Sequence, residues 1–228
     1  MATDRWNNAR VEQAMLLLAR ECGINAAASK VERVGNCDVL LVKRFDREPV
    51  ADGYLRMRMI SALTLLRAED NVTDRRRWSY LDLVEELRRI SAKPQEDAHE
   101  LFRRMVFNAL ISNSDDHLRN HALLAHDDWR LSPAYDLTPT PLTSTERRDL
   151  ALTCGEAGRW ANAANLLSQC QRFLLNHDQA QAIVESMTQI VKNSWYRCAR
   201  EAGLSEQDCQ SISPAFVYPG FLSGILIE

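Results

Sequence analysis

Glycine is scarce in this chain: it has 8 glycines in 228 residues, and none lies in a G-x-G-x-x-G or G-x-x-x-x-G-K-S/T pattern. Backbone cradles for phosphate groups are commonly built from such glycine-rich turns. Lysine is scarce as well, with 4 residues against 24 arginines. The sequence therefore offers no recognisable glycine-rich phosphate loop and few lysines that could contact a phosphate.

Four further absences narrow the class of protein. The six cysteines form no C-x-x-C pair, which favours reduced thiols over a disulfide or zinc framework. No apolar run reaches the roughly 18 residues that span a bilayer, and residues 1–10 lack the apolar stretch of a secretory signal. A formal net charge of -3 argues against nucleic-acid binding by bulk positive charge. We therefore expect a cytoplasmic protein with no membrane partner.

What is present is an ordinary globular composition, 46% hydrophobic and 26% charged. A chain of 228 residues forms one large domain or two small ones and can bury a sizeable core. Its hydrophobic periodicity predicts an α+β fold that is mostly α. We expect helices over 9–21, 54–71, 80–91, 94–112, 160–175, 179–202 and 205–211, and strands over 30–34, 38–45, 121–125 and 129–131.

Two local patterns predict more than the element type. Gly35-Asn36 lies between the first two β-rich runs and predicts a hairpin. Leu40, Leu41 and Val42 are apolar in sequence, which suits a strand buried on both faces. The C-terminal tail, FVYPGFLSGILIE, is apolar and is expected to pack back on the core.

The richest polar segment is N-S-D-D-H-L-R-N-H over residues 113–121, after a strongly amphipathic helix and before a short strand. Asp115 and Asn120 have the spacing D-x-x-x-x-N, and Asp136 follows downstream. A phosphoryl-transfer site needs one carboxylate that accepts the proton of the attacking hydroxyl, and an Asn and a further Asp that hold Mg²⁺ on the nucleotide. The spacing fits this need if the intervening hairpin returns Asp136 to the loop.

The spacing leaves two other interpretations open. Asp and Asn side chains in a loop commonly satisfy nearby backbone groups without any catalytic role. The carboxylates of Asp115 and Asp116, with the imidazoles of His117 and His121, are also suitable ligands for a divalent metal in a phosphohydrolase. The sequence has no second His/Asp cluster on another helix, which argues against the metal site.

Four segments of the chain resemble the HipA-like serine/threonine kinases, the toxin kinases of bacterial toxin–antitoxin operons. The matching segments are LLLARECGI, LLVKRFDRE, LFRRMVFNALISNSDDHLRNH and WRLSPAYDLTP, in the family's order and at family-like distances. The resemblance extends over nearly all of this chain but only over the C-terminal half to two-thirds of a full-length member. It implies the C-terminal lobe of a protein-kinase-like fold, with a small β remnant of the N-terminal lobe.

The resemblance also implies roles for the residues of the polar segment. Asp115 would be the catalytic base, and Asn120 and Asp136 would be the Mg²⁺ ligands. His117 lies in the same motif and would support the nucleotide phosphates or the loop. The implied cofactors are ATP and Mg²⁺, and the implied substrate is a Ser or Thr of a protein.

Further roles follow near the N-terminus. Lys43, Arg44 and Phe45 would form the hinge that binds adenine through its backbone, and Asp46 would reach the ribose. Glu12 matches the helical Glu that normally pairs with the ATP-binding Lys. The resemblance divides the chain into an N-lobe remnant over 1–47 and a helical C-lobe over 48–228, with the catalytic loop at 113–121.

The chain departs from the family at its start. The family places a glycine-rich loop and a strand with the ATP-binding Lys before the helix of Glu12, and only eleven residues precede Glu12 here. Neither Lys30 nor Lys43 replaces that Lys by position, and the regulatory loop serine is missing too. We therefore expect a truncated kinase domain, with apolar surface uncovered on the first helix and the strand pair.

These departures keep a rival interpretation open. The chain would then be a non-catalytic or split kinase half that binds a HipB-like antitoxin or a separately encoded N-lobe. In either case nucleic acid would be reached only indirectly, through the antitoxin.

Overall fold

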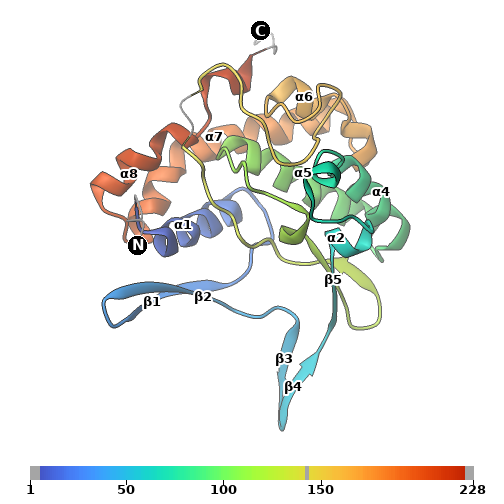
Figure 1. Ribbon diagram of the computed structural model, residues 1–228, viewed down its shortest axis with the longest axis horizontal. Helices are drawn as coiled ribbons and strands as arrows, with labels where there is room; N and C mark the ends of the chain where they lie inside the picture. The colour runs from blue at the N-terminus through green and yellow to red at the C-terminus, as the bar shows by residue number, and fades with distance from the viewer. Residues whose placement is uncertain (1–5, 142–143, 224–228) are drawn as a thin grey trace.

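A body of packed helices carries an arm of β-strands along one side (Figure 1). This computed structural model describes residues 6–141 and 144–223 of the chain. Its element order confirms an α+β fold that is mostly helical. Among the helices of these described residues, none is both long enough and apolar enough to cross a membrane.

Helix α1, Asn8–Glu21, confirms the first predicted helix. The side chain of Asn7 caps it by accepting a hydrogen bond from the backbone N–H of Arg10 at 3.2 Å. The buried positions of α1 recur at helical spacing and pack against α7, His177–Glu201. The expectation that the apolar face of this helix lies uncovered is therefore wrong.

The predicted hairpin is confirmed as β1, Ser29–Val34, paired antiparallel with β2, Cys37–Val42. Gly35 turns the chain with a φ of +59°, a conformation that glycine adopts without strain. Burial of β2 on both faces is wrong, because only one side packs on α1 and Leu41 keeps 45% of its surface exposed. Uncovered apolar surface on the strand pair is confirmed.

The helix predicted over 54–71 is wrong in its first half and interrupted in its second. The structure has two short strands here, β4, Gly53–Arg56, and β5, Arg58–Ser61, followed by one single-turn helix, α2, Ala62–Leu65. Strand β3, Arg47–Val50, precedes this segment and helix α3, Val72–Arg75, follows it. Strand β5 pairs antiparallel with β6, Ala122–Ala125, which is buried along its whole length. This distant pairing overrides the local helical pattern of the segment.

Helices α4, Tyr80–Ile90, and α5, Pro94–Leu110, confirm the next two predictions. The Ser79 side chain caps α4 by accepting a hydrogen bond from the N–H of Leu81, and Pro94 starts α5, where no N–H is needed. The two helices pack against each other, and α5 also packs on α7. Helix α5 is thus central in the helical body, and the polar segment begins just after its C-terminal end.

That segment ends in the 3₁₀ turn η1, Leu118–Asn120, and continues into β6. Strand β6 pairs with β7, Trp129–Leu131, which confirms the two predicted strands. The three-stranded sheet β5-β6-β7 lies at the junction of the β arm and the helical body (Figure 1).

The last third of the chain is helical. The predicted helix over 160–175 is interrupted: it consists of α6, Ala163–Leu167, and the 3₁₀ turn η2, Cys170–Phe173. Helix α7 and the short helix before the tail, α8, Glu206–Ile212, are confirmed. Two further 3₁₀ turns follow, η3, Ser213–Ala215, and η4, Pro219–Leu222. Phe216, Tyr218 and Phe221 are buried, so the first part of the tail packs on the core as predicted. Its last five residues lie outside the described part of the chain.

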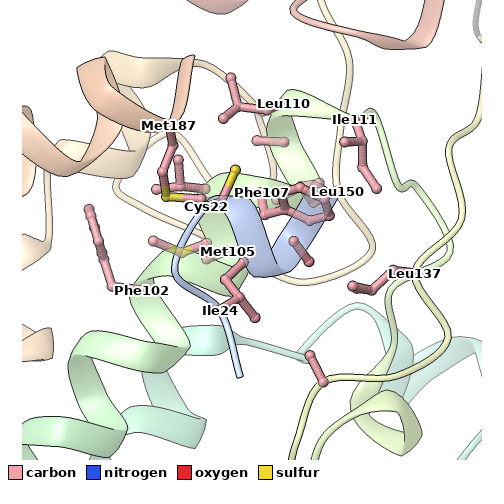
Figure 2. Packing of buried hydrophobic residues seen from close by; sticks show 14 of the residues in the cluster. Cys22, Ile24, Phe102, Met105, Phe107, Leu110, Ile111, Leu137, Leu150 and Met187 are labelled. Carbon is pink, nitrogen blue, oxygen red and sulfur yellow. The ribbon is translucent and has the colours of Figure 1, made fainter. Parts of the chain in front are cut away.

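The core ends close to the polar loops. Figure 2 shows Phe107, Leu110 and Ile111 of α5 and its C-cap packed among residues that directly follow α1, residues of α7 and residues of later segments. Ile111 lies two positions before the polar segment, and Leu137 directly follows Asp136. Because both apolar residues are buried, they fix the position of the chain just before the polar segment and just after Asp136.

Candidate functional site

The loop over 113–121 and the segment that ends at Asp136 lie together. The hairpin of β6 and β7 returns the chain, and the side-chain amide of Asn120 lies close enough to the Asp136 carboxyl to lower its pKa. The charges of Asp115 and His117 also act on this carboxylate. The structure thus brings these four residues of the predicted site into one neighbourhood.

The segment before Asp136 is fixed by backbone hydrogen bonds to the chain that follows α1. The N–H of Ala134 donates to the carbonyl of Asn25 at 2.7 Å, and the N–H of Ala27 donates to the carbonyl of Ala134 at 2.8 Å. Asp136 itself has a φ of +58°, in the left-handed region that Asp enters more readily than most residues. This backbone turn directs the carboxylate toward the loop while Leu137 enters the core.

The surroundings of Asp136 oppose its ionisation in part. Although the residue keeps solvent contact, partial desolvation is the largest effect and raises the pKa of its carboxyl. Asp115 and Asp116 raise that pKa further by repulsion, whereas His117 and the Asn120 amide lower it. A bound cation would relieve the repulsion among these carboxylates.

The carboxyl group of Glu12, on α1, also lies near Asp136. Burial, followed by repulsion from the Asp136 carboxylate, raises the pKa of Glu12 to about 7. The backbone N–H of Asp136 partly offsets this by hydrogen bonding to Glu12. The role implied for Glu12, pairing with a lysine, stays a prediction; the observed contact is with the segment of Asp136.

A cleft of about 430 Å³ opens between α1, the end of β2 and the segment of Asp136. Five residues of the predicted site, Glu12, Lys43, Phe45, Asp46 and Asp136, line it. The other lining residues are Val42, Arg44, Met59 and Tyr135. The rings of Phe45 and Tyr135 lie 5.5 Å apart at an interplanar angle of 35°. The cleft therefore combines two aromatic side chains with the carboxyl groups of Glu12, Asp46 and Asp136.

Asp46 lies at this cleft with its carboxylate already engaged. Arg44 donates two hydrogen bonds to it, from Nε at 2.8 Å and from Nη2 at 2.6 Å. These hydrogen bonds are the largest effect on the carboxyl and hold its pKa below the ordinary range. A ribose hydroxyl that binds Asp46 would have to share this carboxylate with Arg44.

Sequence reasoning missed a buried polar network behind the loop. Tyr80 of α4 donates to Oδ2 of Asp116, and Nε2 of His121 lies 2.9 Å from the same oxygen. Asn108 of α5 donates to the Tyr80 hydroxyl at 3.1 Å, and Asn113 donates to Asn108 at 3.1 Å. No local pattern links Tyr80 and Asn108 to the loop, because their contacts form only when the helices pack.

The network bears on the alternative metal site. Asp116 and His121 are buried with 1% and 2% exposure and bind each other. Among the residues that the structure describes, no group of three or more His, Cys, Asp or Glu side chains is arranged to hold a metal ion. The phosphohydrolase interpretation therefore gains no support from the geometry.

The donor set does fit Mg²⁺ on a nucleotide. Mg²⁺ prefers oxygen ligands and is commonly held by one or two carboxylates together with substrate phosphates. Asp136 lines the cleft and supplies a carboxylate, and the neighbouring Asn120 supplies an amide oxygen. An adenine ring would fit the apolar wall of Phe45 and Tyr135.

Comparison with known proteins places this fold among kinases. The family model described as "HipA-like C-terminal domain" matches residues 2–195. Two Sinorhizobium fredii proteins whose names describe them as candidate kinases, Y4mE and Y4dM, are 29% identical over 133 residues and 31% identical over 143 residues. Each match covers 57% of this chain. The matched part is about a third of each relative's own length, 32% for Y4mE and 33% for Y4dM.

Two solved structures share the fold. HipA of Shewanella oneidensis MR-1, in a complex with HipB and operator DNA, superposes with a TM-score of 0.72 at 17% identity, over 93% of this chain and 54% of that one. The Helicobacter pylori proinflammatory kinase CtkA gives a TM-score of 0.57 at 14% identity, over 93% of this chain and 84% of that one. Because the family model matches most of the chain and the fold agrees with it, the chain belongs to the HipA-like C-terminal domain family.

Proposed function

We propose that this chain is the nucleotide- and Mg²⁺-binding part of a serine/threonine protein kinase that transfers the γ-phosphoryl group of ATP to a protein hydroxyl. The observation that carries the proposal is the grouping of Asp115 and Asn120 around Asp136, which lines the cleft together with the Lys43–Phe45 segment. Phosphoryl transfer needs positioned carboxylates, an amide ligand and a nucleotide pocket in one place. The family membership supports the same reaction class.

Each residue has a role that its position allows. Asp115 is exposed, so its carboxylate can orient an incoming Ser or Thr hydroxyl and accept its proton. Asn120 and Asp136 would hold Mg²⁺, which neutralises charge on the phosphates during transfer. His117, whose charge acts on Asp136, would support the phosphates or the loop.

The hinge role rests on the same cleft. Backbone groups of Lys43 and Phe45 would bind the adenine edge while Phe45 and Tyr135 contact its faces. Asp46 would reach the ribose beside Arg44, and Glu12 would lie near the phosphates. A segment outside these 228 residues would supply the glycine-rich loop and the lysine that the family uses, because neither Lys30 nor Lys43 has the required position.

Thermal unfolding of the purified chain with and without millimolar MgATP tests the proposal. A ligand that binds only the native state stabilises it by about 2.7 kcal/mol at a hundred times its Kd. We expect a Mg²⁺-dependent rise in Tm that Asp136→Ala removes. Asp128→Ala is the matched control, because Asp128 is an exposed aspartate in the turn between β6 and β7. A Tm unaffected by MgATP in the well-folded chain would contradict nucleotide binding by this chain alone.

Loss of the base is tested separately. Asp115→Asn keeps the shape of the side chain and removes its proton acceptor. We expect transfer to a protein substrate to fall by at least about a hundredfold, as general-base catalysis typically contributes 10²–10⁴, while the MgATP-dependent Tm shift remains. Transfer at the unchanged rate would exclude Asp115 as the base.

A second function, a split kinase half that needs a partner, is favoured by the uncovered β arm. Val39, Leu41 and Val42 of β2 and Met59 of β5 are exposed apolar side chains, and Val42 and Met59 line the cleft. Exposed apolar surface commonly marks a protein interface. The partner would be a separate N-terminal lobe or a HipB-like antitoxin, through which DNA would be reached; the HipA neighbour is itself in complex with HipB and DNA.

Sedimentation velocity separates these two functions. A split half is expected to self-associate through the β arm and to become monomeric when Leu41 and Met59 are both changed to Ser. A monodisperse monomer of the unchanged chain at micromolar concentration, with a MgATP-dependent Tm shift, would favour the self-sufficient nucleotide-binding part.

A further inference from the structure

Asp116 lies between two residues of the proposed site yet faces away from it. Asp115 is exposed to solvent, whereas the next residue has its side chain 1% exposed inside the protein. Its Oδ2 accepts a hydrogen bond from the Tyr80 hydroxyl and lies 2.9 Å from Nε2 of His121. The inward carboxylate is thus held by one helix residue and by one residue at the far end of the loop.

The same network reaches the near end of the loop. The Tyr80 hydroxyl accepts from Asn108, which in turn accepts from the side chain of Asn113. Asn113 begins the polar loop and His121 ends it, so both ends connect to Asp116 through buried side chains. Two backbone hydrogen bonds complete the loop: Asn113 N–H to Asn108 at 2.8 Å and Asn120 N–H to His117 at 2.8 Å.

We propose that Asp116, Tyr80 and His121 form a positioning network that sets the backbone of the loop so that Asp115 faces outward and Asn120 faces Asp136. The inference rests on the proposed kinase function for its catalytic consequence but not for its structural one. These three are positioning residues, because none of them lines the cleft. A carboxylate buried this deeply needs its donors, so losing one donor destabilises the present loop conformation relative to open ones.

A Tyr→Phe change inside the network can be compared with one outside it. Tyr80→Phe removes the donor to Asp116 and the acceptor of Asn108 while it keeps the ring, which contacts His121 edge-on at 5.6 Å. Tyr218→Phe is the matched control: Tyr218 is also buried, and its hydroxyl donates to the carbonyl of Ala161 at 2.9 Å, outside the network. Both changes delete one buried hydroxyl, so a general loss of stability affects both variants alike.

Hydrogen exchange measured by mass spectrometry on peptides that cover residues 111–121 gives the first readout. In Tyr80→Phe we expect the amides of Asn113 and Asn120 to exchange at least about tenfold faster than in the unchanged chain, because local opening governs their exchange. In Tyr218→Phe we expect these amides to be unaffected. Equal exchange in the unchanged chain and in Tyr80→Phe would overturn the proposal, whether or not the chain has kinase activity.

Kinetics of ATP-dependent transfer give the second readout. Tyr80→Phe should lower kcat by about tenfold or more with the KM for ATP within about threefold, because a misplaced loop affects the transition state more than nucleotide binding. Asp116→Asn keeps one acceptor and should retain more kcat than Asp116→Ala. Equal kcat in Asp116→Asn and Asp116→Ala would overturn the graded positioning role. If the unchanged chain transfers no phosphoryl group by itself, the exchange readout alone decides the network, and the MgATP-dependent Tm shift decides the proposed function.

Discussion

The hydroxyl of Tyr135 donates a hydrogen bond to the backbone carbonyl of Arg119 at 2.6 Å. Arg119 directly precedes Asn120, and Tyr135 directly precedes Asp136. One side chain therefore joins the two segments that carry the proposed Mg²⁺ ligands. Its ring also lines the cleft beside Phe45, so the same residue contacts the nucleotide space and the loop.

Removing the two parts of Tyr135 separately should have different results. Tyr135→Phe keeps the ring and loses the hydrogen bond to Arg119, so we expect about 1 kcal/mol less stability and a Kd for MgATP within about threefold of the unchanged value. Tyr135→Ala also loses the aromatic wall and should weaken MgATP binding by about tenfold, consistent with a loss of about 1.4 kcal/mol. Urea unfolding and isothermal titration calorimetry measure the two effects. Unchanged MgATP affinity in Tyr135→Ala would place the adenine ring elsewhere.

Arg104 of α5 holds the segment that leads to Asp136 through a buried hydrogen bond to its backbone. The side chain is 1% exposed, and it donates to Glu100 at 2.8 Å and to the carbonyl of Ser132 at 2.6 Å. Arg104→Met leaves both acceptors without this donor, and breaking a buried pair in this way costs about 3 kcal/mol. We expect this loss in the free energy of urea unfolding.

Arg89→Met is the control for that measurement. Arg89 pairs with Glu86 on the exposed face of α4 at 2.6 Å. An exposed pair of this kind is worth about 0.5 kcal/mol. A cost in Arg104→Met no greater than that in Arg89→Met would contradict the supporting role of the buried arginine.

Asp38 joins the β hairpin to the start of α1 and gives the stability a pH dependence. Hydrogen bonds from Arg10, Asn7 and Arg33 lower the pKa of its carboxyl to about 2. Because the folded-state pKa lies below the ordinary value of about 3.9, the contribution is present above that value and is lost as the pH falls through about 2.

Asp38→Asn removes this dependence. We expect the unchanged chain to be more stable than Asp38→Asn at pH 6, with the difference shrinking between pH 4 and pH 2. Chemical unfolding followed by circular dichroism at these pH values checks it. A stability difference that stays constant over the whole range would show that the carboxylate charge of Asp38 contributes nothing.

The sequence alone predicts elements whose signals are local. The helices that contain Met15, Leu83 and Leu101 follow from apolar residues at helical spacing. The hairpin at Gly35 follows from turn chemistry, which needs only neighbouring residues. The helix predicted over 54–71 fails because β5 pairs with a strand more than fifty residues away, and a local pattern contains no information about that partner.

The candidate site divides in the same way. The sequence by itself determined which chemistry is available, because the D-x-x-x-x-N spacing and the later Asp136 fix the carboxylates and the amide that the chain can offer. Only the tertiary structure decided where they act. Packing of α1, α4 and α5 turns Asp116 inward onto Tyr80, leaves Asp115 in solvent and places Glu12 against Asp136. Such contacts join residues far apart in the chain, and they form only when burial of the shared core holds those segments together.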